Sequence, residues 1–235
     1  MKILGIDTST SCGGVGLVDD QGVIADYLLN LPVTHSERLL AAIGLVLGQS
    51  GCNLADLNGI AVSLGPGSFT GLRIGVSVVK GLAFATGLPV VGVPTLDILA
   101  AQIASTSHAI CPILDARKGE VYTAFYRYEG GNRVKRLTPY QAMRPEELVA
   151  QIREKTILMG DGVKTYRDYF RNSLPSLVLF PTLPLCVPHG SVVATLGLEL
   201  VQRGDILDLP VFTPIYVRPS EAEMKLDALK GAASR

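Results

Sequence analysis

The sequence predicts an α/β fold made of two lobes, each with a mixed central sheet that is flanked by helices. Apolar stretches typical of strands alternate with longer stretches typical of amphipathic helices along most of the chain, and this alternation favours sheets covered by helices. The second half of the chain also begins as the first half does. In each half an apolar strand runs into an aspartate, Asp7 or Asp115, and a glycine-containing loop and a second strand follow. Such a repeat predicts two related lobes that face each other.

We expect the lobes at residues 1–107 and 108–235. The pattern of the first lobe predicts strands at 2–6, 14–18, 23–29, 60–64 and 89–93, and helices at 35–50, 69–86 and from 94 or 95 to about 105. The helix at 35–50 begins with a capping-box pattern, Thr34 and Glu37, and ends at Gly51.

The second lobe is less regular. Its pattern predicts strands at 110–114, 120–126 and 156–159, polar turns at 129–132 and 160–162, and helices at 146–155 and 191–203. For the helix at 191–203, packing back against the first lobe is one arrangement to consider. Four prolines predict an extended segment or loop at 173–188, and the polar tail after Glu221 is expected to fray.

Composition excludes several classes of protein. Hydrophobic residues make up 48% of the chain and charged residues 18%, which is too apolar for a disordered protein. Lys and Arg together number 21, as do Asp and Glu, so contact with RNA would need a local patch or a partner. The four cysteines and three histidines lack the spacing of a zinc site. The short N-terminal apolar run does not fit a signal peptide and no stretch fits a membrane span, so we expect a cytoplasmic protein.

The most informative stretch is LGPGSFTGLRIGVSVVKGLA, at residues 64–83. Its Gly-Pro-Gly turn predicts a rigid connection between a strand and a helix that Ser68 caps. On this helix Arg73, Ser77 and Lys80 form a narrow polar stripe, which leaves an apolar arc of roughly 220°, about twice what one sheet face requires. Two interpretations remain open: the helix is wedged between elements of its own subunit, or one side of it faces a partner protein.

The candidate chemistry is limited to two aspartates. Asp7 follows an apolar strand and precedes three hydroxyl residues at 8–10, a pattern typical of an acid that organises Mg²⁺-bound nucleotide phosphates, with Asp115 as its counterpart across a cleft. In the alternative interpretation both aspartates only end strands as turn residues. His35 has no orienting acid and nothing near Cys12 would lower the pKa of its thiol, so we expect no catalytic residue.

Five segments carry a family resemblance: MKILGIDTSTSCGGVGLV, THSERLL, LGPGSFTGLRIGVSVVKGLA, DARKGEVY and PIYVR. From residue 1 to the neighbourhood of Arg218 the chain resembles the TsaB family of tRNA threonylcarbamoyladenosine biosynthesis proteins. The resemblance implies the actin/Hsp70-like (ASKHA, ribonuclease H-like) fold, in agreement with the two repeated lobes.

The resemblance also implies an accessory role without catalysis. TsaB-like proteins bind TsaD, a paralogous catalytic subunit, and with the ATPase TsaE they support threonylcarbamoyl transfer to the adenosine 3′ of the anticodon in tRNAs reading codons that begin with A. It implies a homodimer when the chain is alone, and tRNA contact only through the complex. TsaD carries an H-x-x-x-H metal pair where this chain has VPTLDILA, residues 93–100, which contains no histidine.

The absence of histidine from residues 93–100 affects the expected cofactors and the alternative function. The chain is expected to need no cofactor of its own, although ATP or ADP with Mg²⁺ at the interface of the heteromer is compatible with the resemblance. The alternative is an autonomous nucleotide-dependent phosphotransferase or metallohydrolase on the same fold, which would bind its nucleotide or metal through Asp7 and Asp115 or through ligands that the sequence pattern does not reveal.

The resemblance implies that the first two helices meet those of the partner in a bundle. The apolar excess on these helices gives the candidates for this interface, which are Ala41, Leu45, Gly71, Ile74, Gly75 and Val78.

Overall fold

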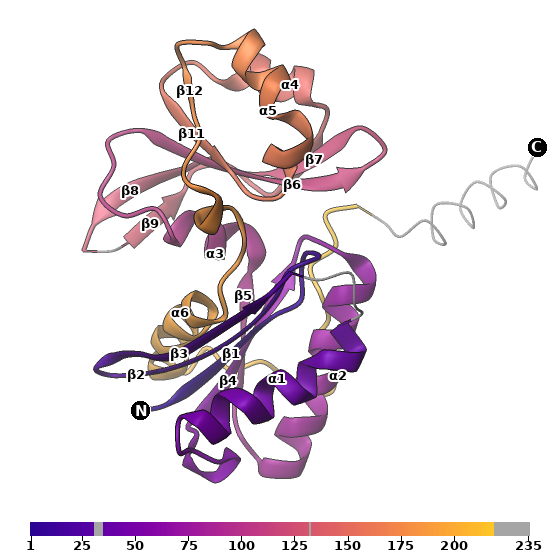
Figure 1. Cartoon of the computed structure of the whole chain (residues 1–235), viewed down its shortest axis with the longest axis vertical. Coiled ribbons are helices and arrows are strands. Elements are labelled where there is room, and N and C mark those ends of the chain that lie inside the picture. Colours follow the sequence, from indigo (N-terminus) through magenta and orange to yellow (C-terminus); the bar gives the residue numbers. More distant parts are fainter. Residues whose placement is uncertain (31–34, 132, 219–235) are drawn as a thin grey trace, which may run out of the picture.

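The computed structural model describes residues 1–30, 35–131 and 133–218 and places them in two lobes stacked along the long axis of the molecule (Figure 1). The predicted α/β fold is confirmed. The first sheet has the strand order β3-β2-β1-β4-β5, in which β1, β4 and β5 are parallel and β1, β2 and β3 are antiparallel. Its strands are β1 (Ile3–Asp7), β2 (Gly13–Asp19), β3 (Gly22–Leu29), β4 (Gly59–Gly65) and β5 (Val90–Pro94).

The second sheet has the order β10-β7-β6-β11-β12, with β8 also paired to β6 and β9 paired to β8. The predicted single strand at 120–126 is wrong, because the chain changes its pairing partner between β7 and β8 and the Phe125 N–H donates to Thr138 Oγ1 instead. The strands are β6 (Ala109–Arg117), β7 (Glu120–Thr123), β8 (Tyr126–Gly130), β9 (Arg133–Arg136), β10 (Gln141–Met143), β11 (Thr156–Met159) and β12 (Val178–Leu179).

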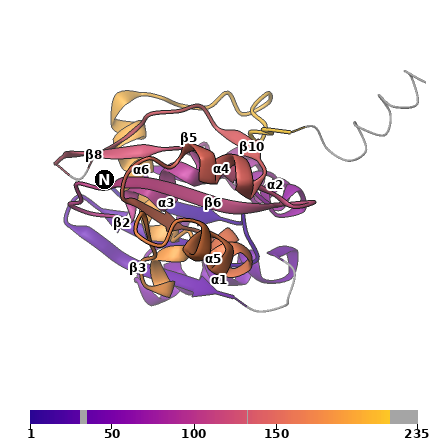
Figure 2. The same cartoon turned by 90° about the horizontal axis from the view of Figure 1, so that it is seen from above.

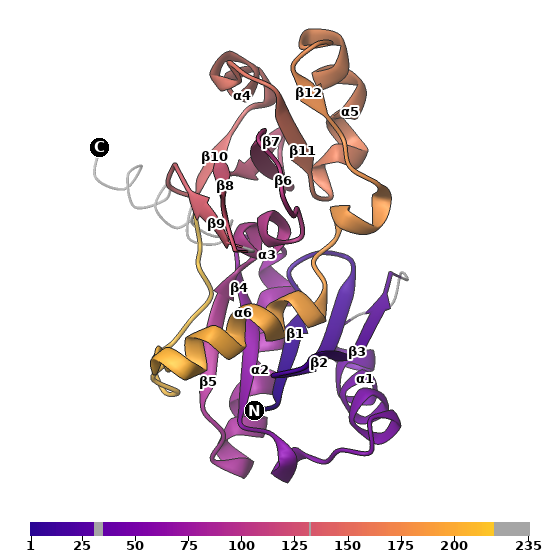
Figure 3. The ribbon, with the colours of Figure 1, turned by 90° about the vertical axis from the view of Figure 1, so that its left-hand side faces the viewer.

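Helices cover both faces of the first sheet. α1 (His35–Gln49) and α2 (Phe69–Thr86) pack on one face, where alternate residues of β1 such as Leu4 and Ile6 point. α6 (Gly190–Arg203) crosses the other face (Figure 3), where the Ile3 side chain of β1 packs against it. By length and composition alone, α2 could cross a membrane. In this structure its buried side packs on the first sheet, as the buried side of a core helix does. Thr34, the predicted N-cap of α1, lies outside the described residues.

α6 comes unusually close to the first sheet because glycines face each other there. A Cβ at Gly16 would overlap the backbone of Ser191, and a Cβ at Gly5 would overlap the Gly190 carbonyl oxygen. Only glycine allows this approach of two backbones. The N-terminus of α6 is held from β3, where Asp26 accepts the Ser191 N–H at 3.0 Å.

The second sheet is also covered on both faces. α3 (Thr95–Ala101) packs under it, between the lobes, and its Asp97 accepts hydrogen bonds from the hydroxyls of Tyr126 and Tyr140. α4 (Pro145–Gln151) and α5 (Gly162–Ser173) cover the opposite face. The helix α5 was not predicted, and α3 and α4 end several residues before their predicted ends. Two short 3₁₀ helices, η1 (Leu54–Asp56) and η2 (Leu183–Cys186), complete the elements.

After α6 the chain returns along the first lobe as a strap, residues 205–218, that runs past α2 to the second lobe (Figure 3). The strap binds the polar stripe predicted on α2. Lys80 Nζ donates to the Pro210 carbonyl at 3.3 Å, and Arg73 Nε donates to the Tyr216 hydroxyl at 3.1 Å. The stripe is therefore partly covered by the chain itself. The tail after Glu221, predicted to fray, lies outside the described residues.

Candidate functional site

Asp7 ends β1 at the boundary between the two lobes, and its side chain is completely buried. Its Oδ1 accepts hydrogen bonds from Ser9 Oγ at 2.7 Å and from the Ser9 N–H at 3.3 Å. Its Oδ2 has no hydrogen-bond partner among the described residues. Burial raises the pKa of Asp7 to about 6, because the charged form is removed from water. At neutral pH the protein therefore keeps a carboxylate that water does not solvate.

The loop after Asp7 is fixed by the start of α2. The Ser68 N–H donates to the Ser9 carbonyl at 2.7 Å, and Thr8 Oγ1 donates to the Gly71 carbonyl at 2.8 Å. A Cβ at Gly71 or Gly75 would overlap Thr8. These two glycines therefore let α2 approach the Asp7 loop and are buried inside the subunit, so their assignment to the partner interface is corrected.

The start of α1 holds the same loop from the other side. His35 Nε2 lies 2.8 Å from the Thr10 carbonyl oxygen, and Arg38 Nη2 donates to the Ser11 carbonyl at 3.1 Å. Burial lowers the pKa of His35 and raises that of the Cys12 thiol to about 11. The neutral imidazole bound to the Thr10 carbonyl helps to position the loop. The Cys12 thiol stays protonated, which makes it a weak nucleophile.

Asp115, the counterpart predicted for Asp7, acts mainly as a turn residue. Its Oδ1 accepts the Arg117 N–H at 2.8 Å, and its own N–H donates to Asp161 Oδ1 at 3.0 Å. Asp161 was not among the sequence candidates, although it stands in a Gly-Asp-Gly turn directly after the apolar strand β11. Burial raises the pKa of Asp161, and its charge contributes to the raised pKa of Asp7. The structure thus brings Asp161 close to both predicted aspartates.

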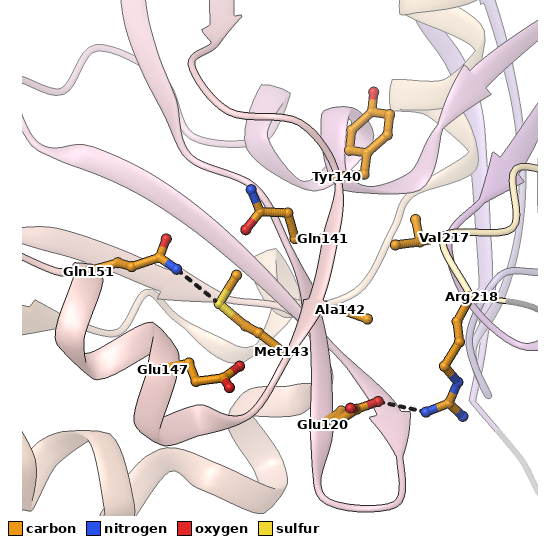
Figure 4. Close-up of a pocket in the computed structure, with 9 residues that line it drawn as sticks. All are labelled: Glu120, Tyr140, Gln141, Ala142, Met143, Glu147, Gln151, Val217 and Arg218. Atoms are coloured by element: carbon orange, nitrogen blue, oxygen red, sulfur yellow. Dashed lines mark hydrogen bonds and ion pairs between the residues drawn. The ribbon is translucent and has the colours of Figure 1, made fainter.

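Within the described part of the chain, no group of three or more His, Cys, Asp or Glu side chains is placed to hold a metal ion. The orphaned Asp7 Oδ2 is an atom that a cation could satisfy, and the Asp161 carboxylate is close enough to raise the pKa of Asp7. Two cavities, of about 690 and 360 Å³, lie elsewhere. The larger one opens between β10, α4 and the end of the strap (Figure 4).

The outward sides of α1 and α2 are rich in apolar and small residues. Leu40 is 60% exposed, Leu45 41% and Phe84 87%. A Cβ added at Gly44 or Gly48 would meet no other atom within 4 Å, so the space above both glycines is free. We call these residues the helical surface, and it comprises Leu40, Ala41, Gly44, Leu45 and Gly48 on α1 and Ile74, Val78, Gly81 and Phe84 on α2. Of the predicted interface residues, Ala41 and Leu45 are exposed, and Ile74 and Val78 are half-buried against the core.

Comparisons with known proteins agree with this fold. A family model described as TsaD, tRNA N6-adenosine threonylcarbamoyltransferase, matches residues 32–224. The tRNA threonylcarbamoyladenosine biosynthesis protein TsaB of Bacillus subtilis is 34% identical over 96% of this chain and 97% of its own length. TsaB of Escherichia coli is 32% identical over 96% of this chain and 98% of its own length.

Solved structures give the same relationship. The structure of YeaZ from Pseudomonas aeruginosa matches with a TM-score of 0.79 at 28% identity, and covers 92% of this chain and 99% of its own. The activator of 2-hydroxyisocaproyl-CoA dehydratase from Clostridium difficile, at 10% identity and a TM-score of 0.53, shares the fold alone. The predicted actin/Hsp70-like fold is confirmed by these neighbours, and the chain belongs to the TsaB family of tRNA threonylcarbamoyladenosine biosynthesis proteins.

Proposed function

We propose that this chain is a non-catalytic subunit that binds a TsaD-type catalytic paralogue through its helical surface. With a TsaE-type ATPase, the complex then transfers threonylcarbamoyl to tRNA in the cytoplasm. The observation that carries the proposal is the apolar outward side of α1, where Leu40 and Leu45 are largely exposed. Apolar patches of this kind on folded proteins mark protein interfaces. Membership of the TsaB family supports the pathway.

The form of the helical surface favours a partner with similar helices. Gly44 and Gly48 lie one turn apart on the exposed side of α1 and carry no side chain into the space above them. Small residues at this spacing allow the backbone of another helix to come close, which increases van der Waals contact. A paralogue or a second copy of this chain would present such helices, and we expect a homodimer when the catalytic partner is absent.

The residues of α3 support a role without independent catalysis. α3 carries no histidine, and its one acidic side chain, Asp97, is held by the hydroxyls of Tyr126 and Tyr140. Both oxygens of this carboxylate are engaged, by the buried Tyr126 and the half-buried Tyr140, and these bonds stabilise the packing of α3 under the second sheet. The carboxylate is a poor ligand for a metal that must also polarise a substrate.

Leu45→Arg tests the proposed interface. Leu45 is exposed, so the arginine should leave the fold intact and weaken association, because its charge would have to be desolvated at the interface. Light scattering and titration with the purified TsaD-type partner should show a loss of affinity of at least about tenfold, equivalent to roughly 1.4 kcal/mol. Leu183→Arg is the matched control, since Leu183 is 66% exposed on η2, away from α1 and α2. Unchanged association of Leu45→Arg, or equal loss in the control, would contradict the proposal.

The buried Asp7 favours a second candidate, an autonomous phosphotransferase or metallohydrolase that binds a nucleotide with Mg²⁺ between the lobes. In that case the orphaned Asp7 Oδ2 would face the cation. Calorimetry of the isolated chain with Mg²⁺ and ATP separates the two candidates. Tight binding that Asp7→Asn abolishes, together with turnover of ATP, would favour the enzyme, whereas the accessory subunit predicts no turnover.

A further inference from the structure

The two lobes are joined on opposite sides of the molecule. On one side the chain leaves η2 in the second lobe and enters α6 in the first, and on the other side the strap returns from the first lobe to the second (Figure 3). Lobes that share one chain move relative to each other unless the contacts between them are strong. The firmness of each connection therefore decides how the boundary between the lobes can open.

The connection from η2 to α6 is held by a network of hydrogen bonds. Gln102, at the end of α3, donates from its side-chain amide to the Leu185 carbonyl at 3.0 Å and accepts the His189 N–H at 3.1 Å. The His189 ring in turn lies 2.7 Å from a carboxylate oxygen of Asp26 on β3. These contacts tie α3, η2, α6 and β3 together, so this side of the boundary suits a pivot rather than an opening.

On the opposite side, the end of the strap closes the boundary. The Ile215 N–H donates to the Leu64 carbonyl at 2.7 Å, which fixes the strap to the first lobe. Arg218 then donates to Glu120 of β7 at 2.6 Å, and these two side chains are 22% and 30% exposed (Figure 4). Water and salt weaken an ion pair that is partly exposed. We call this ion pair the clasp, and an opening on this side would have to break it.

The loop after Asp7 lies on the side of the clasp. Seen from above, β6 reaches the same side of the molecule as α2 and the end of the strap (Figure 2). The Ser68 N–H donates to this loop, and the ring of the next residue, Phe69, is centred 5.3 Å from the Tyr216 ring of the strap. From the second lobe, the charge of Asp161 reaches Asp7 and contributes to its raised pKa. An opening on this side would therefore separate the end of β1 from the second lobe.

We propose that the clasp keeps the boundary between the lobes closed over Asp7, with the network around Gln102 as the pivot. Rupture of the clasp lets the lobes rotate apart, so that water and dissolved ions reach the buried carboxylate. Repulsion between the carboxylates of Asp7 and Asp161 favours the open arrangement, whereas the clasp favours the closed one. The inference concerns two lobes of one chain, so it does not depend on the partner that binds the helical surface.

The test is carboxylate labelling of the purified full chain with a carbodiimide and glycinamide, in which mass spectrometry locates each modified side chain. Asp7 is completely buried and should react slowly in the wild type. Arg218→Gln and Glu120→Gln should each raise the labelling rate of Asp7 about two- to fivefold, the range expected for the loss of a partly exposed ion pair. The reversed pair, Arg218→Glu/Glu120→Arg, should restore the slow rate because it forms the clasp again.

The matched control loosens the same strap within the first lobe. Lys80→Gln removes the cation that donates to the Pro210 carbonyl, and it should leave the labelling rate of Asp7 unchanged. Hydrogen exchange of the buried strand β4 should be the same in every variant. The proposal is overturned if neither single variant raises the rate, if the reversed pair reacts as fast as the single variants, or if Lys80→Gln raises the rate equally. Faster exchange in β4 that matches the gain at Asp7 would indicate global unfolding and would also overturn it.

Discussion

Replacement of Asp7 by asparagine gives a direct measure of how strongly the lobe boundary disfavours a charge. Burial raises the pKa of Asp7 from 3.8 to about 6. A difference of about 2 pKa units between the folded and unfolded states corresponds to about 3 kcal/mol of free energy of unfolding, at 1.36 kcal/mol per unit. Because the folded-state pKa is the higher one, the ionised carboxylate destabilises the protein above pH 6. This penalty decreases as the pH falls through 6 and is absent below about pH 3.8.

Asp7→Asn has no titration at this position, so it removes the pH dependence. The asparagine oxygen can keep the acceptor role toward Ser9, but its amide would take the place of the unpartnered Oδ2 and bring an unsatisfied donor, at a cost of about 1–3 kcal/mol. The absolute stability of the variant at neutral pH is therefore a small difference between two larger effects. The change with pH is the cleaner quantity. Between pH 7.5 and pH 4, the wild type should gain about 2.4 kcal/mol relative to the variant, because a small part of the penalty remains at pH 4.

Urea denaturation of both proteins across this pH range measures the difference, because other titrating groups affect both equally. Asp205→Asn, at an exposed carboxylate after α6, is the control and should run parallel to the wild type. A difference between the wild type and Asp7→Asn that does not change with pH would refute the assignment of a desolvated Asp7. A relative gain for the wild type toward high pH would do so as well.

Two further predictions concern α6. Gly16→Ala should lower the free energy of unfolding by more than about 3 kcal/mol, because its Cβ would overlap the Ser191 backbone. Gly44→Ala, on the exposed side of α1, should instead stabilise the monomer by up to about 1 kcal/mol. Thermal unfolding compares the two variants, and equal effects would exclude the close contact between β2 and α6. The hydrogen bond to Asp26 raises the pKa of His189 above 6.5, so this partly exposed pair should stabilise the protein below pH 6.5 and lose its contribution as the pH rises through the folded-state pKa; His189→Gln should remove that part of the pH profile, and an unchanged profile would show that the pair contributes nothing.

The helices and strands could be predicted where the hydrophobic periodicity and the turn or capping residues at the ends of an element agree. The strand at 156–159 and the helix at 69–86 match β11 and α2. α5 was missed because it begins inside a Gly-Asp-Gly turn, although Val163, Tyr166 and Phe170 repeat at helical spacing and face the core. The end of α3 depends on tertiary contacts, since Gln102 donates to the Leu185 carbonyl from a distant part of the chain.

The site was predictable in part for similar reasons. Asp7 was found because a polar residue that ends an apolar strand stands out in a sequence, but its complete burial depends on the loop that α2 covers. In sequence, Gly71 and Gly75 fit a helix–helix interface equally well. Their close packing on Thr8, which leaves no room for a Cβ, assigns them to the interior. The partner side of α2 is narrower than its apolar arc suggests, because the strap occupies part of the helix.

The central claim is that this chain contributes binding surfaces while a paralogous subunit carries out the chemistry. Reconstitution of threonylcarbamoyl transfer to tRNA, with purified TsaD-type and TsaE-type partners in the presence and absence of this chain, tests it most directly. The account predicts no modified tRNA from this chain alone and full activity only when it is combined with both partners. Modification by the isolated chain, or undiminished modification by the partners without it, would contradict the account.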